Sequence, residues 1–154
     1  MVNYVKGNLL DSDCDYICHQ VNCQGVMNSG IARQIRERWP EVYDGYLARI
    51  DFANRFGKNI LGAVDFILIR GRGKYVVNMF CQDKYGYNGR RYTSYDAFAT
   101  ALHNIASEVA KDDTIGFPKN IGCGLGGGNW KVISALIEEI LGDTHDVYIY
   151  EWEE

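Results

Sequence analysis

The chain has 154 residues, of which 47% are hydrophobic and 23% are charged, and its formal net charge is −4. This length fits one domain that buries roughly 70% of its unfolded surface, and the composition is that of an ordinary soluble globular protein. The acidic balance argues against a protein that coats duplex nucleic acid, and no apolar run approaches the ~18 residues that span a bilayer. We therefore expect a single domain over residues 1–154, no duplex nucleic acid or membrane as partner, and a monomer by default.

The cysteines and the amino terminus predict the cellular location. The five cysteines are an odd number, and "MVNYVKGNLL" has no basic stretch followed by an apolar core. Neither a disulfide framework nor a secretory signal is therefore expected, which leaves a cytoplasmic location. The three histidines lie far apart and no C-x-x-C pair occurs, so we expect no metal site, and no cofactor is expected either.

Strand and helix patterns alternate along the first half of the chain. "NYVKG" (3–7) indicates a short strand, and "DYICHQVN" (15–22) indicates a strand that is buried on both faces. Ile31, Ile35 and Trp39 recur at helical spacing, and Pro40 separates that helix from a second one over 41–56. Two strands follow, over 60–70 and 74–82, and the "GRG" between them is typical of a hairpin.

The second half continues the alternation. A long helix is expected over 93–111, opened by Thr93 or Ser94, with an acidic residue in its first turn. "TIGFP" (114–118) indicates a strand. The next helix, over 129–141, is expected to have Val132, Leu136 and Ile140 on one face, and "DVYIYEW" (146–152) is the final strand. This order predicts an α/β fold in which a mixed, mostly parallel sheet lies between helical layers.

Two glycine-rich loops each follow a strand and precede a helix. They are "NCQGVMNSGIARQI" (22–35) and "NIGCGLGGG" (120–128). Because the carboxyl ends of parallel strands meet at one edge of a sheet, both loops should lie there, where ligands of α/β sheets bind. Their glycines allow close approach of the backbone, and the helix near Gly30 favours an anion at its N-terminus. We expect a phosphate-containing ligand; flexible surface turns are the alternative.

The second loop also contains a known nucleotide-binding fingerprint. "GCGLGG" (122–127) satisfies G-x-G-x-x-G, which in oxidoreductases forms a tight turn directly after the first strand. Here "PKNI" intervenes, and only one helix and one strand remain, so we set that interpretation aside. The motifs GK[ST], GxSxG and HExxH are absent, which argues against the usual routes to nucleotide hydrolysis, acyl transfer and metalloproteolysis.

Four segments, in this order and spacing, resemble the macrodomain family. They are "VKGNLL", "CHQVNCQGVMNSGIARQI", "VVNMFCQ" and "FPKNIGCGLGGGNW", and the resemblance covers nearly the whole chain. It is greatest to the branch that contains ADP-ribose 1″-phosphate phosphatases and terminal ADP-ribose glycohydrolases. The resemblance implies a three-layer α/β/α fold and implies ADP-ribose or a derivative as the ligand.

Carried over position by position, the resemblance implies a binding site. Asn8 stands where the family usually has an acidic residue that reads the adenine amino group, and its side-chain oxygen is expected to accept the same hydrogen bond. Leu9 would offer its backbone, Pro118 would shape the floor, and Tyr150 would line the adenine pocket. Asn22 would contact the distal ribose. The residues expected around this ribose and the adjoining phosphate are Gly25, Val26, Met27, Asn28, Ser29, Gly30 and Ile31. Those expected to cradle the diphosphate are Ile121, Gly122, Cys123, Gly124, Leu125, Gly126 and Gly127.

The resemblance leaves the chemistry open. Relatives that use a lysine and an aspartate have them where this chain has Gln82 and Gly126, although Lys84 lies two residues further on. The phosphatase branch has a histidine that matches His19, which would act as a general acid or position water. A core histidine is the alternative, because strand alternation places His19 and Asn22 on opposite faces. Without His19, we expect Asn22, the substrate phosphate and backbone donors to catalyse a slow reaction.

The leading hypothesis is an enzyme that binds ADP-ribose and hydrolyses a 1″-substituent, with ADP-ribose 1″-phosphate as the substrate. One alternative is a non-catalytic ADP-ribose reader. Another is a hydrolase that removes ADP-ribose from modified proteins or acetyl from acetyl-ADP-ribose. The segment 84–92, with Tyr85 and Tyr87, is interpreted as a solvated loop, and a lid is the alternative.

Overall fold

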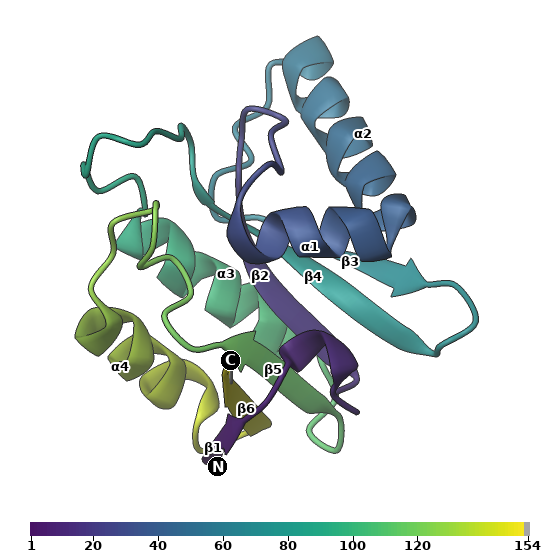
Figure 1. Ribbon diagram of the computed structural model, residues 1–154, viewed down its shortest axis with the longest axis vertical. Helices are drawn as coiled ribbons and strands as arrows, with labels where there is room; N and C mark the ends of the chain where they lie inside the picture. Colours follow the sequence, from purple (N-terminus) through teal and green to yellow (C-terminus); the bar gives the residue numbers. More distant parts are fainter. Residues whose placement is uncertain (153–154) are drawn as a thin grey trace.

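The computed structural model describes residues 1–152 and has one sheet between two pairs of helices (Figure 1). The strands are β1 (Val2–Lys6), β2 (Tyr16–Asn22), β3 (Val64–Ile69), β4 (Lys74–Gln82), β5 (Thr114–Pro118) and β6 (Asp146–Glu151). The helices are α1 (Gly30–Arg38), α2 (Pro40–Phe56), α3 (Tyr95–Glu108) and α4 (Trp130–Leu141), with a short 3₁₀ helix, η1 (Leu9–Asp11).

The strands lie in the order β1-β6-β5-β2-β4-β3. All neighbouring strands are parallel except β3 and β4, which form the predicted hairpin. The predicted mixed, mostly parallel sheet is therefore confirmed. Because β2, β4 and β5 run in the same direction, the loops that follow them start at one edge of the sheet.

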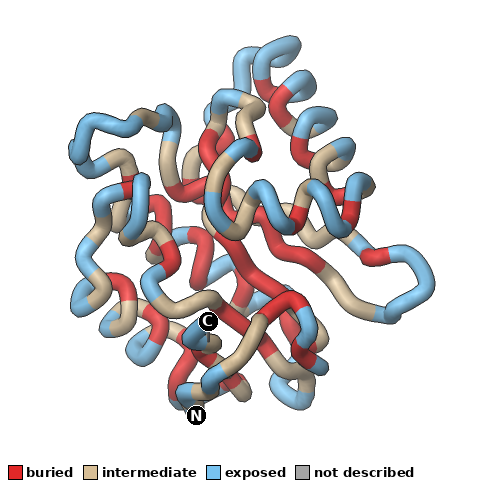
Figure 2. The backbone as a smooth tube through the Cα atoms, in the orientation of Figure 1, coloured by how far each residue is buried: buried red, intermediate tan, exposed pale blue. Residues whose placement is uncertain are grey.

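Alternate residues of the central strands pack on opposite faces, as the two-residue period of a strand requires. In β4, Val76 and Phe80 pack with α1 and α2, whereas Val77, Met79 and Cys81 pack with α3 and α4. Figure 2 shows that the central strands are buried along most of their length. Burial on both faces explains their nearly continuous apolar sequence and confirms the three-layer α/β/α fold.

The helix boundaries follow local signals. Pro40 is the first residue of α2, as its preset φ allows. The Ser94 side chain caps α3 by accepting a hydrogen bond from the Ala97 amide. This helix ends at Glu108 and not at the predicted 111, because Val109 has an extended conformation. No helix within residues 1–152 has the length and apolarity needed to cross a membrane.

The buried face of α4 differs from the prediction. The predicted face was Val132, Leu136 and Ile140, whereas the fully buried residues are Ile133, Ile137 and Leu141. Val132 is 38% exposed. The predicted set and the buried set are both apolar and both recur every four residues, so the helical periodicity of the sequence does not distinguish them. Packing against α3 and the sheet selects the second series.

Candidate functional site

The candidate site lies at the edge of the sheet where β2, β4 and β5 end. A cavity of about 450 Å³ is lined on one side by Ser29, Gly30 and Ile31 at the start of α1. On the other side it is lined by most of the segment 118–126, which follows β5. The two glycine-rich loops thus meet, as the sequence predicts. We call this space the central cavity.

Both loops that line the central cavity contain backbone N–H groups without a hydrogen-bond partner among residues 1–152. In the second loop, the amides of Gly122, Gly124, Leu125 and Gly126 have no hydrogen-bond partner within residues 1–152, whereas neighbouring amides bond to carbonyls of the same loop. At α1, the first-turn amides have no intrahelical acceptor, and Ser29 makes no side-chain cap bond. Backbone donors of this kind can bind an anion without help from a charged side chain.

Two smaller cavities adjoin the central one. The Asn22 cavity, of about 120 Å³, shares Gln20, Ser29 and Gln82 with the central cavity. The Trp152 cavity, of about 190 Å³, instead shares Ile31, Pro118 and Lys119 with it. Because the shared residues differ, the small cavities lie at different ends of the central one. The three together form an elongated groove, and the middle cavity alone is within the range of ~300–1,000 Å³ typical of small-molecule sites.

The glycines of the second loop have different structural roles. Gly122 and Gly127 have φ values of +74° and +71°, which L-residues with side chains rarely adopt. A Cβ atom on Gly124 would meet no atom within 4 Å. A Cβ atom on Gly126 would lie 2.6 Å from Thr93 Oγ1 and 2.8 Å from the Gly122 carbonyl. A side chain is therefore sterically possible at Gly124 but not at Gly126 without rearrangement.

The first loop is organised by Asn22 and by a tyrosine that the sequence analysis missed. The Tyr46 hydroxyl lies 2.6 Å from Asn22 Oδ1 and accepts hydrogen bonds from the Gly25 and Val26 amides. Asn22 in turn donates from Nδ2 to the Val26 carbonyl over 2.8 Å. Burial raises the pKa of Tyr46 far above its ordinary value, so the hydroxyl keeps its proton.

The position of Asn22 also corrects a sequence-based expectation. His19 belongs to the alternate set of β2 residues that faces α1 and α2, as do Ile17 and Val21. Asn22, expected on the opposite face, instead contacts Tyr46 of α2. The register between β2 and β4 shifts between Val21 and Asn22. Regular alternation therefore ends before Asn22, and its side chain organises the loop.

A second network fastens the 120–128 loop to the strands. Gln20 Nε2 donates to Gln82 Oε1 and to Thr93 Oγ1, over 2.7 and 2.8 Å. The Thr93 hydroxyl donates to the Gly122 carbonyl, and the Thr93 amide donates to the carbonyl of Gly126. This network occupies the space that a side chain at position 126 would need. Lys84 is exposed and lines none of the three cavities, so a lysine–aspartate pair is not assembled here.

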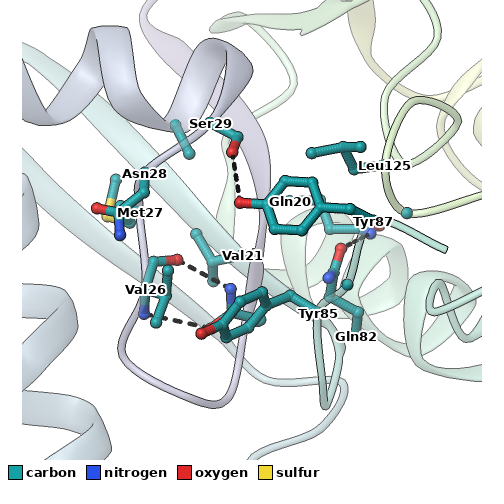
Figure 3. A pocket seen from close by; sticks show the side chains of 14 residues that line it. Gln20, Val21, Val26, Met27, Asn28, Ser29, Gln82, Tyr85, Tyr87 and Leu125 are labelled. Carbon is teal, nitrogen blue, oxygen red and sulfur yellow. Dashed lines mark hydrogen bonds between the residues drawn. The ribbon is translucent and has the colours of Figure 1, made fainter.

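Tyr85 and Tyr87 cover the Asn22 cavity (Figure 3). The Tyr87 and Ser29 hydroxyl oxygens are 3.2 Å apart, which joins the segment after β4 to the start of α1. Both tyrosines remain exposed, Tyr87 to 68%. The segment interpreted as a solvated loop is therefore exposed but also forms part of the groove wall.

Sixteen of the twenty residues expected at the site line the groove. Asn8, Leu9, Pro118 and Tyr150 line the Trp152 cavity, as implied for the adenine end. The four that line none of these cavities are His19, Gly25, Cys123 and Gly127. Gln20, Gln82, Tyr85, Tyr87 and Trp152 line the groove but were absent from the expected binding set. Within residues 1–152, no three His, Cys, Asp or Glu side chains are close enough to hold a metal ion.

His19 is a core residue in this fold. Its side chain is fully buried, and Nε2 lies 2.5 Å from Asn78 Oδ1 on the neighbouring strand. Burial lowers the pKa of His19 from 6.5 to about 4, and the hydrogen bond to Asn78 acts in the opposite direction. At neutral pH the ring is therefore uncharged, and it lies outside the groove in which it was expected to act.

We expect His19 to make folding stability dependent on pH. The unfolded chain binds a proton on this ring below pH 6.5, whereas the folded protein does so only near pH 4. The free energy of unfolding should therefore fall as the pH drops through this range, by about 3 kcal/mol at most. Urea unfolding across these pH values measures the effect. His19→Gln should remove this part of the pH dependence of the free energy of unfolding. The control His103→Gln, at an exposed position, should not remove it. Equal pH dependence in the wild type and both variants would contradict the assignment of this effect to His19.

The chain is similar in sequence to two curated relatives. A DNA ADP-ribosyl glycohydrolase from Mycobacterium tuberculosis is 27% identical over 150 residues, which is 96% of this chain. The chain spans about 40% of the length of that relative. An ADP-ribose 1″-phosphate phosphatase from Saccharomyces cerevisiae is 35% identical over 63 residues, covering 40% of this chain and 34% of the relative. No family model matches the sequence.

Solved structures agree with the architecture. A protein of unknown function from Bacteroides thetaiotaomicron has a TM-score of 0.83 at 28% identity, with 98% of both chains covered. A macrodomain protein from Streptomyces coelicolor has a TM-score of 0.79 at 27% identity, covering 97% of this chain and 98% of the other. A Thermosipho africanus DarTG structure in complex with ADP-ribose has a TM-score of 0.74 at 19% identity, covering 97% of this chain and 41% of the other. At this low identity, the similarity supports a shared fold and nothing more.

Proposed function

We propose that this chain, which has the fold of a macrodomain, binds ADP-ribose and hydrolyses a substituent at the 1″ position, with ADP-ribose 1″-phosphate as the substrate. The observation that carries the proposal is that both loops lining the central cavity contain amides without a hydrogen-bond partner among residues 1–152. A diphosphate in the central cavity would accept hydrogen bonds from these donors. The base would then lie in the Trp152 cavity and the distal ribose in the Asn22 cavity.

The proposed reaction is the attack of water on phosphorus, with release of the 1″-hydroxyl of ADP-ribose and inorganic phosphate. None of the side chains that line the Asn22 cavity, among the residues the structure describes, is charged at neutral pH. Positioning therefore comes from Asn22, the Gln20 and Gln82 amides, and the hydroxyls of Ser29 and Tyr87. With no charged group to act as base, we expect slow turnover whose rate depends on fixing the substrate at both ends.

A phosphate-release assay tests the activity. The protein is incubated with ADP-ribose 1″-phosphate, and separately with ADP-ribosylated protein and ADP-ribosylated DNA, while phosphate and ADP-ribose release are followed. We expect slow phosphate release that falls further in Tyr87→Phe, since this change removes one hydroxyl from the groove. Lys131→Gln, an exposed change outside the groove, should leave the rate unchanged.

Among residues 1–152, the side chains that line the Asn22 cavity are uncharged, and this also favours a second function, a non-catalytic reader of ADP-ribose. Binding of ADP-ribose without turnover of any of the three substrates would establish the reader and exclude the phosphatase. Release of ADP-ribose from protein or DNA, without release of phosphate, would instead assign a glycohydrolase. The cytoplasmic location, the monomeric state and the lack of duplex nucleic acid as partner stay predictions from the sequence.

A further inference from the structure

A lysine lies where two cavities of the groove meet. Among residues 1–152, Lys119 is the only charged residue that lines any of the three cavities. It lines both the central cavity and the Trp152 cavity, and the other residues that these two cavities share, Ile31 and Pro118, are apolar. Within the described part of the chain, the groove therefore has its one charged group at this junction.

Lys119 lies to one side of the donors that we assign to the diphosphate. The second-loop amides without a partner among residues 1–152 belong to Gly122, Gly124, Leu125 and Gly126, which line the central cavity but not the Trp152 cavity. With the diphosphate against these amides and the base in the Trp152 cavity, the ribose that joins them would lie at the junction. A ribose is uncharged, so a lysine beside it contributes most when that ribose carries an anionic group.

Glu151 is the ion-pair partner of Lys119, and the pair is weak. Lys119 Nζ lies 3.5 Å from Glu151 Oε2, and the two side chains are 32% and 54% exposed. Ion pairs with this much exposure contribute little to stability, because water screens both charges. Glu151 lines none of the three cavities. The ammonium group can therefore exchange this carboxylate for an anion in the groove at little energetic cost.

We infer that Lys119 makes the groove selective for ligands that carry a phosphate on the base-proximal ribose. Such ligands are derivatives of ADP-ribose that are phosphorylated at the 2′ or 3′ position. A phosphate monoester has a charge of about −1.5 to −2 at neutral pH and three oxygens that accept hydrogen bonds, so it should attract the ammonium group more strongly than a carboxylate does. The inference rests on the proposed function, because it assumes where the base and the diphosphate lie.

Isothermal titration calorimetry can compare ADP-ribose with its 2′-phosphate and its 3′-phosphate. The three ligands share the base, both riboses and the diphosphate, so the ratio of their affinities measures the effect of the added phosphate. We expect the wild-type protein to bind at least one of the phosphorylated ligands about three- to tenfold more tightly than ADP-ribose.

Three variants test whether Lys119 causes this preference. Lys119→Gln removes the charge, and the preference should disappear; a general loss of diphosphate binding would affect all three ligands and cancel in the ratio. Glu151→Gln removes the competing carboxylate and should increase the preference. Lys131→Gln is the matched control, because Lys131 is exposed on α4 and lines none of the three cavities, and it should keep the wild-type ratio.

The outcomes separate this inference from the proposed function. If the wild type binds ADP-ribose at least as tightly as both phosphorylated ligands, the role of Lys119 is overturned and the proposed function stays intact. A preference that survives in Lys119→Gln, or one that does not increase in Glu151→Gln, would also overturn this role. If none of the three ligands binds, the proposed function and the selectivity fail together.

Discussion

Gly124→Glu should lower the affinity for ADP-ribose by about a hundredfold or more while the protein remains folded. Gly124 is not among the glycines with positive φ, and a Cβ atom at this position would meet no atom within 4 Å. The new carboxylate would therefore extend without strain from a loop residue that lines the central cavity. There it would repel a diphosphate and block the unpartnered amides of the second loop. Isothermal titration calorimetry measures the affinity, and thermal unfolding measures the stability.

Two control variants separate charge from bulk. Gly124→Ala adds a methyl group without charge and should reduce the affinity far less than the glutamate does. Ala135→Glu adds the same charge on an exposed position of α4 and should bind like the wild type. Undiminished affinity of Gly124→Glu would show that the diphosphate does not lie against the second loop.

Tyr46→Phe should destabilise the protein by about 1–3 kcal/mol and also weaken ADP-ribose binding. The hydroxyl is fully buried and bonds to both oxygens of Asn22 while it accepts from two amides of the first loop. Removing it takes one hydrogen-bond partner from the buried Asn22 and from the half-buried amides of Gly25 and Val26, and the loop loses its link to α2. Urea unfolding gives the free energy, and titration with ADP-ribose gives the affinity.

Tyr43→Phe is the control for this change. Tyr43 lies one helical turn before Tyr46 and packs near its ring, but no hydrogen bond of its hydroxyl is found within residues 1–152. It should retain both stability and affinity within about 0.5 kcal/mol. If Tyr46→Phe also left stability and affinity unchanged, the hydrogen bonds of the Tyr46 hydroxyl would not contribute to the stability of the first loop.

The sequence predicted the fold and the place of the two glycine-rich loops because these depend on local patterns, whereas the individual groove residues were implied by the resemblance to macrodomains. Apolar strands, helix caps such as Ser94, and glycines in the loops that follow β2 and β5 are each visible within a few residues. Once the strands are parallel, the loops that follow them must share an edge of the sheet. The meeting of the two glycine-rich loops therefore follows from the topology of the sheet alone.

The groups that shape the groove depend on contacts between distant parts of the chain. Tyr46 is 24 residues from Asn22, and Thr93 is 73 residues from Gln20. Nothing in the sequence around these residues indicates the pairing.

The most direct test of the account is a crystal structure of the protein with ADP-ribose. We expect diphosphate oxygens within about 3 Å of the Gly124 and Leu125 amide nitrogens, and a phosphate close to the first turn of α1. The terminal ribose should lie beneath Tyr87. A nucleotide bound outside the groove, or within it but with the diphosphate away from both loops, would contradict the account.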